Sequence, residues 1–184
     1  NDPVTNIKEG LIIYEGDTVN GIAEKIDVHT RGRISKKEVI NKWKNKTYLK
    51  SLIKQYWFLT DEILANGILF PLEGYLAPNS YIIGPSDSVE TITEKILVEK
   101  DKLLSPYKNT KFKNGYSLHQ ILSLASVVER ETIKKEDKYL VSGVFYNRIK
   151  EGMMLQSDIT VLYALQKHSE YVSYKDLKVN SPYN

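Results

Sequence analysis

The segment from Ser117 to Glu131 constrains the fold of this chain more than any other part of the sequence. Its apolar residues recur at the spacing of an amphipathic helix, because an advance of about 100° per residue places them on one face. They are Leu118, Ile121, Leu122, Ala125 and Val128. Ser117 stands before the run and Gln120 follows three residues later, which is the pattern of a capping box at a helix start. The segment therefore predicts a helix that has a capped N-terminus and packs through one apolar face.

Two glutamates close this helix. Glu129 follows Ala125 by one turn and falls inside the apolar face, whereas Glu131 follows Val127 and falls at its flank. Residues two apart on a helix point in different directions, so we expect separate partners for the two acids. We interpret Glu129 as anchored by a hydrogen-bond donor, and Glu131 as bordering a cleft and desolvated enough by its apolar neighbours to keep its proton. A solvated helix end, with Glu129, Arg130 and Glu131 facing water, is the alternative that spacing leaves open.

Composition excludes several classes of protein. The 184 residues and 41% apolar content suit one or two compact domains with a real core. A net charge of +3 is too small to indicate a nucleic-acid partner by itself. The absence of cysteine rules out disulfides, thiol nucleophiles and thiolate metal sites. His29, His119 and His168 lack the spacing of metal ligands, so we expect neither a metal nor another cofactor.

The first half of the chain reads as a small α/β region. Leu11 to Tyr14 predicts a strand, and Asp17 or Thr18 can cap the helix that follows. This opening is similar to the start of a LysM-like sugar-binding module, and it is also typical of any small α/β unit.

A basic segment follows between Arg31 and Lys54, where lysine and arginine greatly outnumber acids. Aromatic residues are interleaved with it or follow it directly, namely Trp43, Tyr48, Tyr56 and Trp57. Basic and aromatic groups together can bind single-stranded nucleic acid or the faces of sugars. A solvated lysine face over an aromatic core is the alternative interpretation.

Residues 84 to 87, read Gly-Pro-Ser-Asp, form the clearest internal break. We therefore predict a strand-helix N-terminal lobe over residues 1–85 and a helical lobe over 86–184. Together they make an α+β fold that is mostly helical. Further helices are expected at about 88–103, 137–151 and 160–165. For the second of these, we expect a buried stripe of Leu140, Val141, Val144 and Phe145, with Met153 to Leu155 packing under the site that Glu131 borders.

Three boxes in the sequence resemble the YceG-like family of endolytic murein transglycosylases. They are Pro71 to Tyr81, Leu124 to Thr132, and the pair Val144 to Ile149 with Gly152 to Asp158. The chain departs from the family pattern at Asn79, where aspartate is common, and at Ile159, where proline is usual. Ser181 to Asn184 matches the start of a further box whose usual continuation is missing.

The resemblance implies an enzyme that cuts the glycan strands of nascent peptidoglycan between N-acetylmuramic acid and N-acetylglucosamine, leaving a 1,6-anhydro end. It implies Glu131 as the catalytic residue, and a strand-helix lobe packed on a lysozyme-like catalytic lobe. The residues that it implies in substrate binding or site support are Glu73, Tyr75, Glu129, Asn147, Arg148, Gln156, Ser157, Asp158, Tyr183 and Asn184. A non-catalytic module that binds peptidoglycan is the main rival.

The resemblance also implies a location and partners. The chain begins without methionine and has no apolar run of roughly 18 to 20 residues, so we expect it to be the soluble part of a longer protein. Family members are anchored in the bacterial membrane by one helix, which would place this region on the extracytoplasmic side. The expected partners are glycan strands and peptidoglycan synthases of the penicillin-binding type, without nucleic acid.

Overall fold

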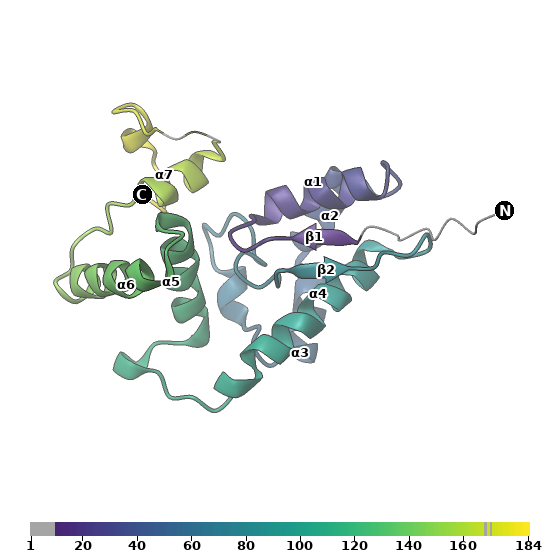
Figure 1. Ribbon diagram of the computed structural model, residues 1–184, viewed down its shortest axis with the longest axis horizontal. Coiled ribbons are helices and arrows are strands. Elements are labelled where there is room, and N and C mark those ends of the chain that lie inside the picture. Colours follow the sequence, from purple (N-terminus) through teal and green to yellow (C-terminus); the bar gives the residue numbers. More distant parts are fainter. Residues whose placement is uncertain (1–9, 168, 170) are drawn as a thin grey trace. The chain divides into compact units, whose positions relative to one another are not determined.

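The computed structural model describes residues 10–167, 169 and 171–184, so His168 lies outside the described residues. The chain forms two compact units, one of Asn1–Leu64 with Phe70–Lys111 and one of Ala65–Leu69 with Phe112–Asn184. In the described part there are seven α-helices and one two-stranded sheet, which confirms the predicted α+β, mostly helical fold (Figure 1).

The first unit contains the sheet and four helices. Strands β1 (Leu11–Ile13) and β2 (Asn79–Tyr81) pair in antiparallel register, with Leu11 opposite Tyr81. The helices are α1 (Val19–His29), α2 (Lys36–Trp43), α3 (Lys46–Gln55) and α4 (Val89–Leu104). Each begins after a side chain that accepts a main-chain N–H bond, and these caps are Thr18, Ser35, Asn45 and Ser88. Because such caps are local, the helix starts follow directly from the sequence.

Two of the four aromatic residues of the basic segment belong to the core of this unit, and Tyr48 and Trp57 are half-buried. Trp43 and Tyr56 are buried, and Trp43 Nε1 donates a hydrogen bond to Thr93 Oγ1 at 2.8 Å. Around them Lys42 pairs with Glu90, and other lysines of the segment face solvent. The solvated lysine face over an aromatic core is therefore confirmed, and two rings that would stack on bases are out of reach.

The break at residues 84 to 87 is a turn inside the first unit. The Asp87 carboxylate accepts the Gly84 N–H at 2.7 Å and pairs with Lys95 of α4, which holds its pKa below the usual range. Arg33 Nη1 donates to the Asp87 carbonyl at 2.7 Å. These contacts keep α4 with the first unit. The chain enters the second unit for Ala65–Leu69 and again from Phe112 onward, whereas the predicted lobes divide at 85/86.

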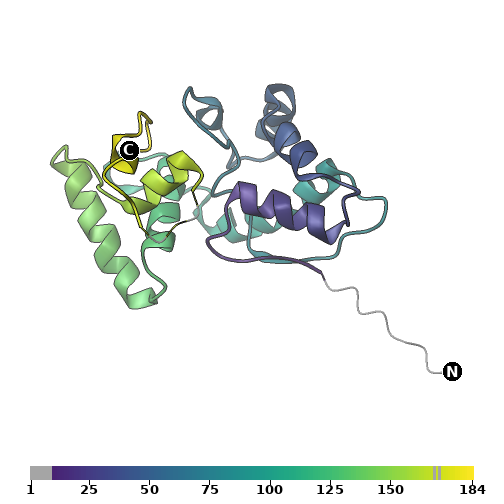
Figure 2. The same cartoon turned by 90° about the horizontal axis from the view of Figure 1, so that it is seen from above.

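The second unit is built on helices α5 (Leu118–Glu131), α6 (Lys135–Lys150) and α7 (Asp158–Leu165). Ser117 and Gln120 form the predicted capping box at the start of α5. Figures 1 and 2 show α5 beside α6 and α7 in two views, as their contacts require. Among the described residues of both units there are also four short 3-10 turns: η1 (Asp61–Leu64), η2 (Ser105–Tyr107), η3 (Lys113–Gly115) and η4 (Asp176–Lys178).

The apolar stripe predicted for α6 is wrong for two of its four residues. Phe145 is buried and Val141 is half-buried, but Leu140 is 72% exposed and Val144 is 49% exposed. Five residues turn a helix by about 140°, so Leu140 and Phe145 lie on nearly opposite faces. Met153 and Met154, expected to pack under the site, are also exposed. Within residues 10–167, 169 and 171–184, no helix is long and apolar enough to cross a membrane.

Candidate active site

The last turn of α5 and the first turn of α6 are joined through Glu129. Both of its carboxylate oxygens accept hydrogen bonds from Lys138 Nζ, each at 2.8 Å. The side chains of this pair are 34% and 27% exposed. An anchoring donor for Glu129 was predicted and is confirmed. Its identity was missed, although the short turn between the two helices brings Lys138 back against the end of α5.

Glu131 has a different partner, as the helix geometry predicted. Its Oε1 accepts a hydrogen bond from Ser157 Oγ, and Ser157 is only 4% exposed. Glu131 itself is exposed, so the predicted half-desolvation is wrong. The reason is local. Glu131 is the last residue of α5, and Thr132 continues in an extended conformation, so no further turn of helix covers the carboxyl group.

The loop between α6 and α7 brings Ser157 to this position. Arg148 of α6 donates a hydrogen bond from its Nη1 to the carbonyl of Leu155. Gln156 follows with φ at 53°, in the left-handed region. Thr160 Oγ1 then donates to the Ser157 carbonyl at 2.9 Å. The structure therefore joins Ser157 to Glu131 and places Arg148 and Gln156 in the same loop assembly.

Three other predicted residues of this unit face solvent. Asn147 lies near the end of α6, Asp158 begins α7, and the Gln156 side chain is exposed between them in sequence. Their expected contacts with substrate remain predictions.

The C-terminal box makes contacts within the second unit. The Tyr183 hydroxyl accepts the Leu69 N–H at 3.2 Å, and its ring meets that of Tyr163 edge-on at 5.0 Å. Asn184 Nδ2 donates to the carbonyls of Leu177 and Val179 at 2.9 and 3.1 Å. Tyr183 and Asn184 thus support this unit, and Tyr183 attaches the short segment 65–69 to it.

Glu73 and Tyr75 lie in the first unit. The Glu73 carboxylate accepts the Val19 N–H at 3.1 and 3.3 Å, where the amino end of α1 favours negative charge. Tyr75 is completely buried against Phe58, and this burial raises the pKa of its hydroxyl. Both residues therefore support the loop that carries them, and Tyr75 is closed to substrate in this structure.

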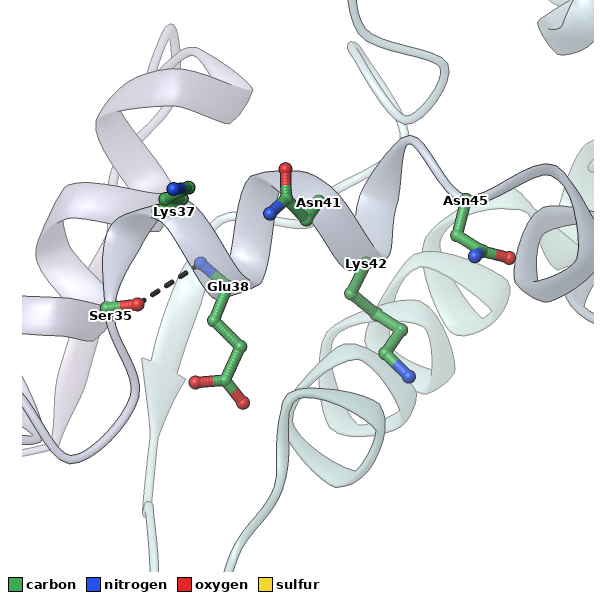
Figure 3. A pocket seen from close by; sticks show the side chains of 6 residues that line it. All are labelled: Ser35, Lys37, Glu38, Asn41, Lys42 and Asn45. Atoms are coloured by element: carbon green, nitrogen blue, oxygen red, sulfur yellow. Dashed lines mark hydrogen bonds between the residues drawn. The ribbon is translucent and has the colours of Figure 1, made fainter.

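Two open hollows occur on the first unit. One, of about 420 Å³, follows α2 and is lined by Ser35, Lys37, Glu38, Asn41, Lys42 and Asn45 (Figure 3). The bond drawn there, from Glu38 N–H to Ser35 Oγ at 3.2 Å, is a helix cap. The other, of about 740 Å³, lies between the end of α3, β2 and α4. Neither is lined by the glutamates of α5. No group of three acidic, histidine or cysteine residues suited to a metal was found within the described residues.

Comparisons with known proteins agree in pointing to one family. The YceG-like family is matched over residues 2–184. An endolytic murein transglycosylase of Bacillus subtilis is 39% identical over 95% of this chain and 48% of its own length. One of Streptococcus pneumoniae is 32% identical over 100% of this chain and 35% of its own. The crystal structure of a YceG-like protein from Listeria monocytogenes superposes with a TM-score of 0.90 at 36% identity, covering 96% of this chain and 58% of that one. The chain thus spans half or less of the length of these two curated relatives.

Proposed function

Because this chain belongs to the YceG-like family, we propose that it supplies the catalytic acid of an endolytic murein transglycosylase acting on peptidoglycan. The observation that carries the proposal is the pairing of Glu131 with the buried Ser157 hydroxyl at an exposed helix end. An exposed carboxyl group that is held by one hydrogen bond is open to a polysaccharide, and this supports the proposal.

The reaction needs one carboxyl group that serves twice. Protonated Glu131 gives its proton to the oxygen that links N-acetylmuramic acid to N-acetylglucosamine, and the bond from C1 to that oxygen breaks. The C6 hydroxyl of the same muramic acid attacks C1, and the Glu131 carboxylate takes the hydroxyl proton. The products are a 1,6-anhydro end and a free N-acetylglucosamine end. Each proton transfer of this kind contributes about 100- to 10,000-fold to a rate.

The two glutamates of α5 are suited to different tasks. Both oxygens of Glu129 bind Lys138, so this residue connects α5 to α6. Glu131 offers one oxygen to Ser157, and we assign proton transfer to the other. Most glycosidases use two carboxyl groups, one of which activates water or attacks the sugar. A substrate that attacks itself through C6 removes the need for the second.

The direct test is to incubate the protein with purified glycan strands and to detect anhydro ends by mass spectrometry. We expect Glu131→Gln to abolish these products while the circular dichroism spectrum stays unchanged. Glu136→Gln, the same change at an exposed position in the first turn of α6, is the matched control and should retain activity. Undiminished cleavage by Glu131→Gln would mean that another acid is responsible. Strand binding without any anhydro product would instead support the rival wall-binding module.

We also propose that the protein works on the extracytoplasmic side of a bacterial membrane, attached by a single spanning helix, beside peptidoglycan synthases. Support comes from the substrate class, because nascent glycan strands are assembled there. Protease treatment of intact protoplasts should degrade this region in the native full-length protein. Protection from the protease would contradict the location.

A further inference from the structure

Ser157 uses its hydroxyl in an unusual way for its position. It is the N-cap residue of α7, where a serine side chain ordinarily accepts an N–H from the first turn. In this helix the Ser157 side chain makes no capping bond. The hydroxyl instead donates to Glu131 Oε1 on α5. The stabilisation that a cap gives a helix is thus replaced by a contact with the proposed acid.

Burial makes this contact directional. Ser157 is 4% exposed, so water has little access to its hydroxyl, and a buried hydroxyl without a partner is costly. Its bond to Glu131 therefore favours one orientation of the carboxyl group, although Glu131 itself faces solvent. An exposed glutamate would otherwise sample several rotamers.

The main chain before Ser157 is also held in a defined conformation. Arg148 holds the Leu155 carbonyl, and Gln156 adopts a left-handed conformation with φ at 53°. A residue other than glycine loses about 1 to 2 kcal/mol in that region. Such strain persists where surrounding contacts determine the backbone, and it concentrates at functional sites. Arg148 on one side and Thr160 on the other supply those contacts here.

We propose that Ser157 is a positioning residue for the reaction, acting through Glu131. By occupying Oε1 it directs proton transfer to Oε2, and Arg148 with the left-handed Gln156 keeps Ser157 in place. The inference rests on the proposed function, because it concerns the same acid. It assigns Ser157 no contact with the glycan.

The test measures kcat and KM for anhydro-end formation with the native protein and its variants. Ser157→Ala should lower kcat by about 10- to 100-fold, since a misplacement of about 1 Å has an effect of that size, and should leave KM nearly unchanged. Ser157→Thr keeps the hydroxyl and should restore most of kcat. Ser126→Ala is the matched control, because that hydroxyl lies on α5 and donates to the Ser123 carbonyl of its own helix.

Two further measurements separate this inference from the proposed function. In the Glu131→Gln background, which forms no product, Ser157→Ala should leave the binding of glycan strands unchanged, because Ser157 is assigned no contact with the glycan. Arg148→Gln, which frees the loop without touching Ser157, should lower kcat less than Ser157→Ala does and provides a second test if that variant fails to fold. A raised KM with normal kcat, or full activity of Ser157→Ala, would overturn the positioning role while Glu131→Gln remained inactive. An active Glu131→Gln would overturn the proposed function itself.

Discussion

The two units differ in what holds them together. In the first, apolar side chains from all four helices and both strands are buried, among them Leu97, Trp43 and Leu11. In the described part of the second, the buried apolar residues are only Val128, Phe145 and Val161. Around the proposed acid the second unit relies on polar contacts between helix ends and a loop. Apolar packing shapes the first unit, whereas directional bonds define the site in the second.

This difference has an energetic meaning. Burial of an apolar side chain contributes about 1.5 to 3 kcal/mol, while a partly exposed ion pair contributes about 1 kcal/mol or less. Hydrogen bonds weaken steeply when their angles change, so they fix orientation better than apolar contacts do. The contacts of the second unit therefore orient its carboxyl group, but they stabilise the unit less than the buried side chains stabilise the first.

One leucine-to-alanine substitution in each unit should give the largest difference in stability between the two units. Leu97→Ala on α4 should destabilise the first unit by about 2 to 5 kcal/mol, because Leu97 is completely buried. Leu140→Ala on α6 should change stability by no more than about 0.5 kcal/mol, because Leu140 is 72% exposed. Urea unfolding followed by circular dichroism, which both units contribute to, measures the loss for each variant. Trp43 and Trp57, the two tryptophans of the chain, lie in the first unit, so their fluorescence reports on it alone. Equal losses for the two variants would contradict the contrast.

A smaller effect is expected at the ion pair between α5 and α6. Glu129→Gln and Lys138→Gln should each cost about 1 kcal/mol or less, since both side chains are roughly one-third exposed. The double variant should cost no more than either one, because both changes remove the same contact. Amide hydrogen exchange of α5 and α6 detects a loss of this size. Additive effects would show that Glu129 and Lys138 stabilise the unit independently.

The smallest predicted effect depends on pH and lies in the first unit. Hydrogen bonds from Lys95 and from the Gly84 N–H lower the pKa of the Asp87 carboxyl group. Asp87 is therefore ionised more readily in the folded protein than in the unfolded chain. Stability from Asp87 is therefore complete above its ordinary pKa of 3.8 and is lost as the pH falls through the lower, folded value. Asp87→Asn should lower the Tm near neutral pH, with a difference that shrinks in acid. A difference in Tm that stays the same from neutral to acid pH would contradict this role of Asp87.

The sequence was most informative where structure is local. Ser117 and Thr18, the latter one of two predicted candidates, start helices as predicted, because a cap bonds to main chain two or three residues away. The separate partners of Glu129 and Glu131 followed from helix geometry alone.

What the sequence could not provide depends on tertiary contacts. The division of the chain into these units depends on contacts such as those of Asp87 with Lys95 and with Arg33, which no local pattern shows. The exposure of Leu140 was missed because an apolar residue on a helix does not reveal which face finds a neighbour. The family resemblance indicated Ser157 only as a residue of the site. Its hydrogen bond to Glu131 is visible only in the structure.

If Glu131 lets the glycan cleave itself, no atom of water enters the product. The reaction is run in water enriched in heavy oxygen, and the masses of the muramic acid ends are measured. We expect anhydro ends that contain no heavy oxygen, because the C6 hydroxyl closes on C1, and we expect these ends to disappear with Glu131→Gln. Muramic acid ends that carry one heavy oxygen from water would identify a hydrolase and rule out closure by the C6 hydroxyl.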